Sequence, residues 1–90
     1  MLAIITEFVG TFIFISVVLA TGQAVPIAIA LASVIYFGGS VSGGHFNPAI
    51  STMFLAKGGI TMTTWLAYVI AQVLGGLLAL MWYKAASAKK

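Results

Sequence analysis

Three long apolar stretches leave this chain few residues with which to face water. They cover residues 2–20, 25–39 and 63–83, and only a few polar side chains interrupt each one. Nineteen helical residues rise about 28 Å, which is enough to cross the hydrocarbon core of a bilayer. The 90 residues are 62% hydrophobic and only 6% charged, so a water-soluble domain of this size would expose too much apolar surface. The stretches predict an all-α membrane protein with three transmembrane helices.

A shorter apolar segment lies between the second and third stretches. Asn47 is a strong helix N-cap residue, Pro48 suits the first helical position, and Gly58-Gly59 supplies a stop. The roughly nine residues between these signals rise about 13 Å, which is too short to cross a bilayer. We predict that residues 40–57 form a loop and a re-entrant half-helix ending near the membrane midplane. The alternative is a capped amphipathic helix on the membrane surface.

The start of the half-helix gathers hydrogen-bonding groups. Non-helical backbone at the midplane is tolerated only inside protein or along a water-filled cavity, so one chain offers half of a water path. The helix dipole aims its positive end at the midplane, the amide of Asn47 can donate, and the carbonyls of residues 42–46 lack helical partners. Such a site suits a neutral hydrogen-bonding solute such as water and disfavours cations. The candidate pore-lining residues here are Gly43, Gly44, His45, Phe46, Asn47, Pro48 and Ala49.

Three polar side chains near this segment have more than one possible role. His45 either lines the pore or stabilises the loop by hydrogen bonding. Glu7, the only acidic residue, is costly within a spanning segment and is therefore a functional candidate. It either accepts N–H bonds from the irregular backbone of residues 38–46, or exchanges protons or cations, or is solvated near the membrane surface. Gln72 is expected to bond the loop or a neighbouring helix rather than a solute.

Aromatic and basic residues mark the ends of the third stretch. Trp65 and Tyr68 lie toward one end, Trp82 and Tyr83 lie at the other, and Lys84 follows. This arrangement is typical of the aromatic belts and snorkelling lysines of a membrane-spanning helix. The third stretch is therefore expected to cross the bilayer completely.

The remaining composition disfavours other functions. The sequence has no cysteine, no nucleophile–base pair, no cluster of metal ligands and no phosphate loop, so we expect no enzyme, no metal and no cofactor. The lysines indicate membrane anchoring rather than nucleic-acid binding. Lys57 and the N-terminal amine would lie on one membrane face, and Lys84, Lys89 and Lys90 on the other. This bias toward a cytoplasmic C-terminus is weak and predicts insertion in both orientations.

Three motifs in this order resemble one repeat of the aquaporin, or major intrinsic protein, family. Residues 7–12 (EFVGTF) are similar to its first-helix pattern, and residues 42–49 (SGGHFNPA) to its first Asn-Pro-Ala loop. The third-helix pattern is matched by Tyr68, Ala71, Gln72, Gly75 and Gly76. The resemblance implies an integral, multi-pass membrane channel whose two inverted repeats bring two half-helices together, with four pores in a tetramer. For this chain it implies pores built from antiparallel homodimers, and four dimers, or eight chains, per assembly.

The resemblance also implies roles for individual residues. Glu7 would brace the loop, and the narrowest part of the pore would be lined by Ile27, Ile35, Gly44 and Ile50. Where Ile50 stands, the second repeat of the family usually carries arginine. This apolar filter favours glycerol-like and other small neutral solutes as well as water.

We therefore predict a passive channel for water and small neutral solutes. Two other functions stay open. One is a dual-topology, proton-coupled small-molecule exporter that uses Glu7. The other is a non-transporting half-channel that needs an unlike partner. The loop at residues 42–49 argues against the exporter, which needs no half-helix.

Overall fold

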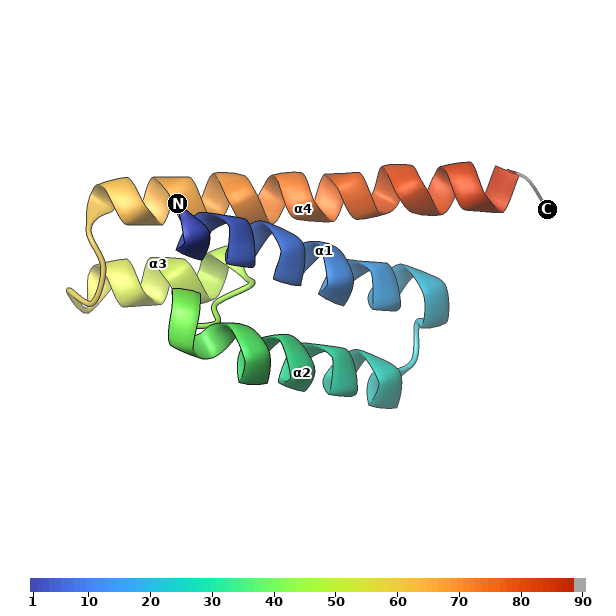
Figure 1. The fold of residues 1–90 in the computed structure, drawn as a ribbon, viewed down its shortest axis with the longest axis horizontal. Helices are drawn as coiled ribbons and strands as arrows, with labels where there is room; N and C mark the ends of the chain where they lie inside the picture. Colours follow the sequence, from blue (N-terminus) through green and yellow to red (C-terminus); the bar gives the residue numbers. More distant parts are fainter. Residues whose placement is uncertain (89–90) are drawn as a thin grey trace.

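The computed structural model describes residues 1–88, and within that range it contains four helices and no strand (Figure 1). Lys89 and Lys90, part of the predicted basic end, lie outside the described residues. Three of the helices are long and apolar enough to cross a membrane, and the third in the chain is not. The predicted all-α fold, with three spans and one short helix, is confirmed. The helices are α1 (Leu2–Thr21), α2 (Ala24–Ser42), α3 (Pro48–Ala56) and α4 (Met62–Ala88).

Helix α1 is the central element of the bundle. It packs against both α2 and α4, whereas α3 packs against α4. Figure 1 shows α3 beside one half of the bundle only, with its start turned toward the middle. The N-terminus lies at the same end of the molecule as the turn between α3 and α4, and α4 runs to the opposite end of the 46 Å long axis. The described chain therefore starts and finishes at opposite ends.

Local signals explain where the helices end. Helix α2 continues past the predicted end at Gly39 and stops at Ser42, because Gly43 adopts a φ of 93° and its N–H donates to the carbonyl of Gly39. A left-handed residue ends a right-handed helix, and glycine adopts that conformation without steric cost. Helix α3 begins after Asn47, whose Oδ1 accepts the N–H of Ala49 at 2.8 Å. Helix α4 extends beyond the predicted span, to Ala88.

Helices α1 and α4 lie in close contact at Gly75. A Cβ atom at this position would lie 2.6 Å from the carbonyl oxygen of Phe8 on α1, so a larger residue would push the helices apart. The close approach brings Gln72 of α4 next to Glu7 of α1. The amide nitrogen of Gln72 and Oε1 of Glu7 are 2.9 Å apart.

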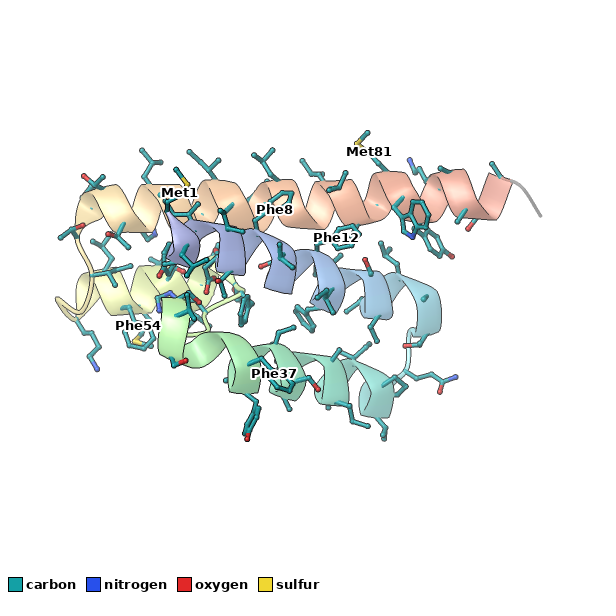
Figure 2. All side chains as sticks on the ribbon, in the orientation of Figure 1. Met1, Phe8, Phe12, Phe37, Phe54 and Met81 are labelled. Carbon is teal, nitrogen blue, oxygen red and sulfur yellow. The ribbon has the colours of Figure 1, made fainter. Side chains whose placement is uncertain are left out.

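Polar side chains share the interior of this bundle with a few alanines and aromatic rings, and apolar side chains cover its outside. The largest fully buried side chains are Gln72, Glu7 and Ser51. By contrast, Phe37 is 78% exposed and Met81 is 67% exposed, and Figure 2 shows Met81 pointing away from the helices. In water this distribution would be unfavourable, whereas hydrocarbon solvates the apolar outside and drives polar groups to pair internally.

Candidate functional site

One carboxylate holds the loop between α2 and α3. Oε2 of Glu7 accepts the backbone N–H of His45 at 3.0 Å and the hydroxyl of Ser42 at 2.7 Å. Its Oε1 accepts the N–H of Phe46 at 2.7 Å and the amide of Gln72 at 2.9 Å. Four donors surround a side chain that is 0% exposed, so Glu7 is not the surface-solvated residue of the third interpretation. The structure brings the two predicted loop-bracing residues together at this point.

Ser42 and Tyr68 hold the beginning of the loop. The hydroxyl of Tyr68 donates to the carbonyl of Ser42 at 2.6 Å, and the N–H of Gly44 donates to the Ser42 hydroxyl at 3.2 Å. Tyr68 is only 5% exposed, so its expected place in an aromatic belt is wrong. The Ser42 carbonyl was expected to be free for solute and is occupied instead. The carbonyls of residues 43–46 accept no hydrogen bond from the described part of the chain.

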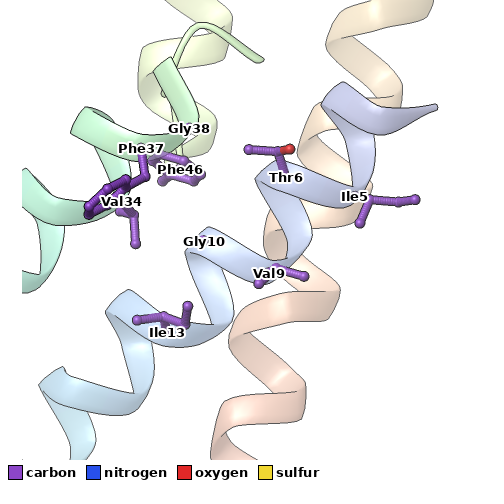
Figure 3. A pocket seen from close by; sticks show the side chains of 9 residues that line it. All are labelled: Ile5, Thr6, Val9, Gly10, Ile13, Val34, Phe37, Gly38 and Phe46. Atoms are coloured by element: carbon purple, nitrogen blue, oxygen red, sulfur yellow. The ribbon is translucent and has the colours of Figure 1, made fainter. Parts of the chain in front are cut away.

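Phe46 anchors the loop in a strained conformation. Its φ of 53° is left-handed, which is uncommon for a bulky residue. Its ring fills the space between two helices: Cβ atoms at Gly10 and Gly38 would lie 2.1 Å and 3.1 Å from ring atoms. Figure 3 shows Phe46 beside Gly38 in the outer groove between α1 and α2, a hollow of about 310 Å³. The side chain is buried in this position, so only the backbone of Phe46 is available to a solute.

His45 is enclosed by one hydroxyl and two aromatic rings. Its Nδ1 lies 2.8 Å from the hydroxyl oxygen of Ser51. The imidazole stacks on Phe54 with centroids 4.6 Å apart, and the ring of Tyr68 meets it edge-on at 5.1 Å. Burial lowers the pKa of this loop histidine, and the negative charge of Glu7 partly opposes that shift. The site therefore favours a neutral imidazole held in one orientation.

An open groove begins at the N-terminus of α3. It has a volume of about 520 Å³ and runs between α1 and α4. The nine residues of α3 rise about 13 Å, whereas the twenty residues of α1 rise about 30 Å, so α3 is less than half as long as α1. No described residue fills the remaining length. The groove is lined by Thr11, Phe14, Ile15, Leu19, Phe46, Asn47, Pro48, Gln72, Val73, Gly76, Leu77 and Leu80.

Asn47 and its neighbours face the open side of this tip. Asn47, Pro48 and Ala49 are all exposed. Oδ1 of Asn47 is used in capping α3, and its Nδ2 has no partner within residues 1–88. A hydrogen-bond donor and the N-terminal end of a helix dipole are therefore directed at the head of the groove.

The four predicted filter residues do not form one ring within a single chain. Gly44 lies against Ile35, since a Cβ atom at Gly44 would be 3.5 Å from Ile35. Ile35 and Ile50 are 43% and 39% exposed. Ile27 lies eight positions earlier on α2, about 12 Å along the helix. Elsewhere in the described chain, no group of three or more His, Cys, Asp or Glu residues could hold a metal ion.

The profile of the major intrinsic protein family matches residues 1–89. The chain belongs to this family. With three helices able to span a bilayer, this member of the major intrinsic protein family is an integral membrane protein.

Individual relatives support this membership. The chain is 37% identical to the glycerol uptake facilitator protein-like 6 of Lactiplantibacillus plantarum, with 83% of this chain and 39% of that protein covered. It is 34% identical to aquaporin Z of Photorhabdus laumondii, with 81% of this chain and 38% of that protein covered. It is 33% identical to the lens fiber major intrinsic protein of Gallus gallus, with 83% of this chain and 33% of that protein covered. The chain thus spans 33–39% of the length of these relatives, and no solved structure gives a significant match.

The structure adds two hydroxyl groups to the site of this major intrinsic protein. Ser42 and Ser51 were not singled out by their sequence positions, yet both bond the loop network. Ser51 lies one helical turn after the cap residue Asn47, but its burial is not evident from that position. Ser42 opens the SGGHFNPA segment, but the sequence does not show that its hydroxyl bonds Glu7, which is 35 positions away.

Proposed function

We propose that this chain is half of a passive transmembrane channel for water and glycerol-like small neutral solutes. In this proposal a second copy, inserted in the opposite orientation, completes the pore. Four such dimers, or eight chains, make the assembly. The observation that carries the proposal is the groove that continues the line of α3 beyond its N-terminus.

The groove supplies the place for a second half-helix. It lies along the parts of α1 and α4 that α3 does not accompany, and Asn47 stands at its head. A two-fold axis in the membrane plane would place α3 of the partner chain in this groove. It would also place α3 of this chain in the partner's groove. Such a contact uses the same surface on both chains, as two-fold symmetric interfaces do.

The groups at the tip suit a neutral solute. Two helix N-termini and two Asn47 amides would meet at the centre, and their positive field opposes cations. The free carbonyls of residues 43–46 supply acceptors beside these donors. A molecule that both donates and accepts hydrogen bonds can exchange its water partners for these groups. The names of two relatives, an aquaporin and a glycerol uptake facilitator-like protein, agree with water and glycerol as solutes.

Flux measurements on the purified chain test the channel. Stopped-flow light scattering of proteoliposomes should report water permeability above that of empty liposomes, with measurable glycerol permeability and no dependence on a proton gradient. Transport that requires a proton gradient would support the exporter instead. Absence of both fluxes would support the half-channel that needs an unlike partner.

Cross-linking tests the antiparallel pair. The chain has no cysteine, so one introduced thiol reports on one position. Ala49→Cys lies at the exposed tip of α3 and should cross-link to its copy near the midplane. Ala85→Cys, exposed at the far end of α4, should not, because antiparallel copies place it on opposite membrane faces. Efficient cross-linking through Ala85→Cys alone would indicate a parallel arrangement and refute the pair.

A further inference from the structure

The hydrogen bonds around Gln72 fix the direction of its amide group. Glu7 already receives three donors, so the Gln72 atom 2.9 Å from Oε1 is a nitrogen and not the amide oxygen. The same nitrogen lies 2.8 Å from the hydroxyl oxygen of Ser51. Its two hydrogens therefore match two acceptors, one on Glu7 and one on Ser51.

The hydroxyl of Ser51 then has one role left. A serine hydroxyl has a single hydrogen, and this oxygen already accepts from Gln72. Its hydrogen is directed to Nδ1 of His45, which is 2.8 Å away. Because Nδ1 accepts, a neutral imidazole at His45 must carry its proton on Nε2.

The other ring nitrogen of His45 is directed toward Gly43. A Cβ atom at Gly43 would lie 3.2 Å from Nε2, so any side chain there would cover it. The left-handed φ of 93° independently favours glycine at that position. Within residues 1–88, Nε2 has no hydrogen-bond partner, and the bond between Nδ1 and Ser51, together with the stack on Phe54, holds the ring in this orientation.

We propose that Ser51 is a positioning residue that holds His45 as the tautomer protonated on Nε2. The loop thereby presents one N–H donor beside the acceptor carbonyls of residues 43–46. The effect on solutes rests on the channel function proposed above, whereas the tautomer does not. Water and hydroxyl groups of small neutral solutes accept from this N–H and donate to the carbonyls. A cation that only donates, such as ammonium, finds no acceptor on His45.

Nuclear magnetic resonance of the purified chain in lipid tests the tautomer directly. His45 is the only histidine, so ¹³C,¹⁵N-labelled histidine gives one ring. At pH 7.5 the unprotonated nitrogen should correlate with Cγ, which identifies Nδ1, and the protonated one with Cδ2. The opposite assignment, or a ring protonated on both nitrogens, would overturn the proposal whatever the flux.

Two substitutions of Ser51 separate positioning from packing. Ser51→Ala removes the donor and should shift the tautomer ratio roughly fivefold, which corresponds to about 1 kcal/mol for one hydrogen bond. Ser51→Thr keeps the hydroxyl and should restore the wild-type spectrum. Ser33→Ala is the matched control, because the Ser33 hydroxyl bonds only the carbonyl of Ile29 on its own helix. An unchanged spectrum in Ser51→Ala would contradict a positioning role.

Flux measurements then test whether the donor acts on solute. Water flux through Ser51→Ala should fall about two- to fivefold and recover in Ser51→Thr. A shifted tautomer with unchanged water flux would refute the donor's action on solute. Wild-type protein that shows the Nε2-protonated ring but conducts no water would instead refute the proposed channel and leave the role of Ser51 in place.

Discussion

The carboxylate of Glu7 and the backbone N–H of Phe46 are 2.7 Å apart, although 39 positions separate them in the sequence. Phe46 has a left-handed backbone that a free chain rarely adopts, so this contact offsets local strain. The neighbouring bond from His45 ends on the other oxygen of the same carboxylate. One side chain on α1 therefore sets the direction of two successive loop peptides, and with them the carbonyls of Gly44 and His45.

Replacement of Glu7 should affect stability before it affects transport. Glu7→Leu leaves two loop N–H groups unpaired in the interior at a cost of about 1–3 kcal/mol each, so we expect loss of the folded protein in detergent. Glu7→Gln keeps one acceptor oxygen and should retain partial stability and some water flux. Thermal unfolding followed by circular dichroism, with stopped-flow flux, checks both. An intact Glu7→Gln assembly with no transport would favour the exporter.

Enlargement of Gly10 should displace the Phe46 ring. A methyl group at Gly10 would lie 2.1 Å from a ring atom, and overpacking of this kind costs about 1–3 kcal/mol. Gly10→Ala is therefore expected to lower the unfolding temperature. Gly39→Ala, whose Cβ would meet nothing within 4 Å, should be neutral or slightly stabilising, because alanine favours a helix by up to about 1 kcal/mol. Equal effects of the two changes would argue against the Phe46 wedge.

A substitution at Gly76 should block pairing of two chains without changing how a single chain folds. Gly76 lines the groove at the head of α3, and the nearest atom to a Cβ there is 3.8 Å away on Ile15. Gly76→Leu should leave the helical content of the single chain intact but fill the groove, so that dimers and water flux are both lost. Ala85→Leu adds an equivalent side chain at an exposed position and should preserve both. Dimers of normal stability in Gly76→Leu would show that the groove is not the interface.

Ile50 is the site at which solute range should change. Its side chain is 39% exposed beside the tip of α3, and two antiparallel copies would place it on both sides of the pore centre. Ile50→Arg adds bulk and a fixed charge, so glycerol flux should fall about tenfold, at the lower end of steric discrimination in fitted sites, and water flux should fall less. Ile50→Leu keeps the volume and should change neither. The relative loss of glycerol and water flux in proteoliposomes decides this point.

Length and composition were sufficient to predict the fold. An apolar segment bounded by Asn47-Pro48 and Gly58-Gly59 is too short to span a bilayer, and this constraint does not depend on tertiary contacts. The end of α2 was harder to place. Gly38 and Gly39 look like a stop, but both remain helical, and the helix ends only where Gly43 takes a positive φ.

The interior of the site depended on contacts that no local pattern shows. The scarcity of charge drew attention to Glu7, because an isolated carboxylate in a spanning stretch needs partners. Its hydroxyl partner Ser42 and the bond from Tyr68 to the Ser42 carbonyl depend on how the loop folds back onto α1 and α4. From the sequence alone, Tyr68 fits an interfacial aromatic belt as well as it fits the interior. Only the bond from its hydroxyl to the Ser42 carbonyl shows that it lies inside.

The bond between Glu7 and Gln72 spans 65 positions, so the two residues leave the ribosome at different times and their bond can form only late. A ribosome adds about 5–20 residues per second, so Gln72 is made roughly 3–13 s after Glu7. During that interval α1 and α2 can enter the membrane as a hairpin, but the acidic side chain has none of the help that α4 later gives. Before α4 is made, Glu7 can bond only the loop donors Ser42, His45 and Phe46, so the set of four donors around it is completed only after Gln72 has been synthesised.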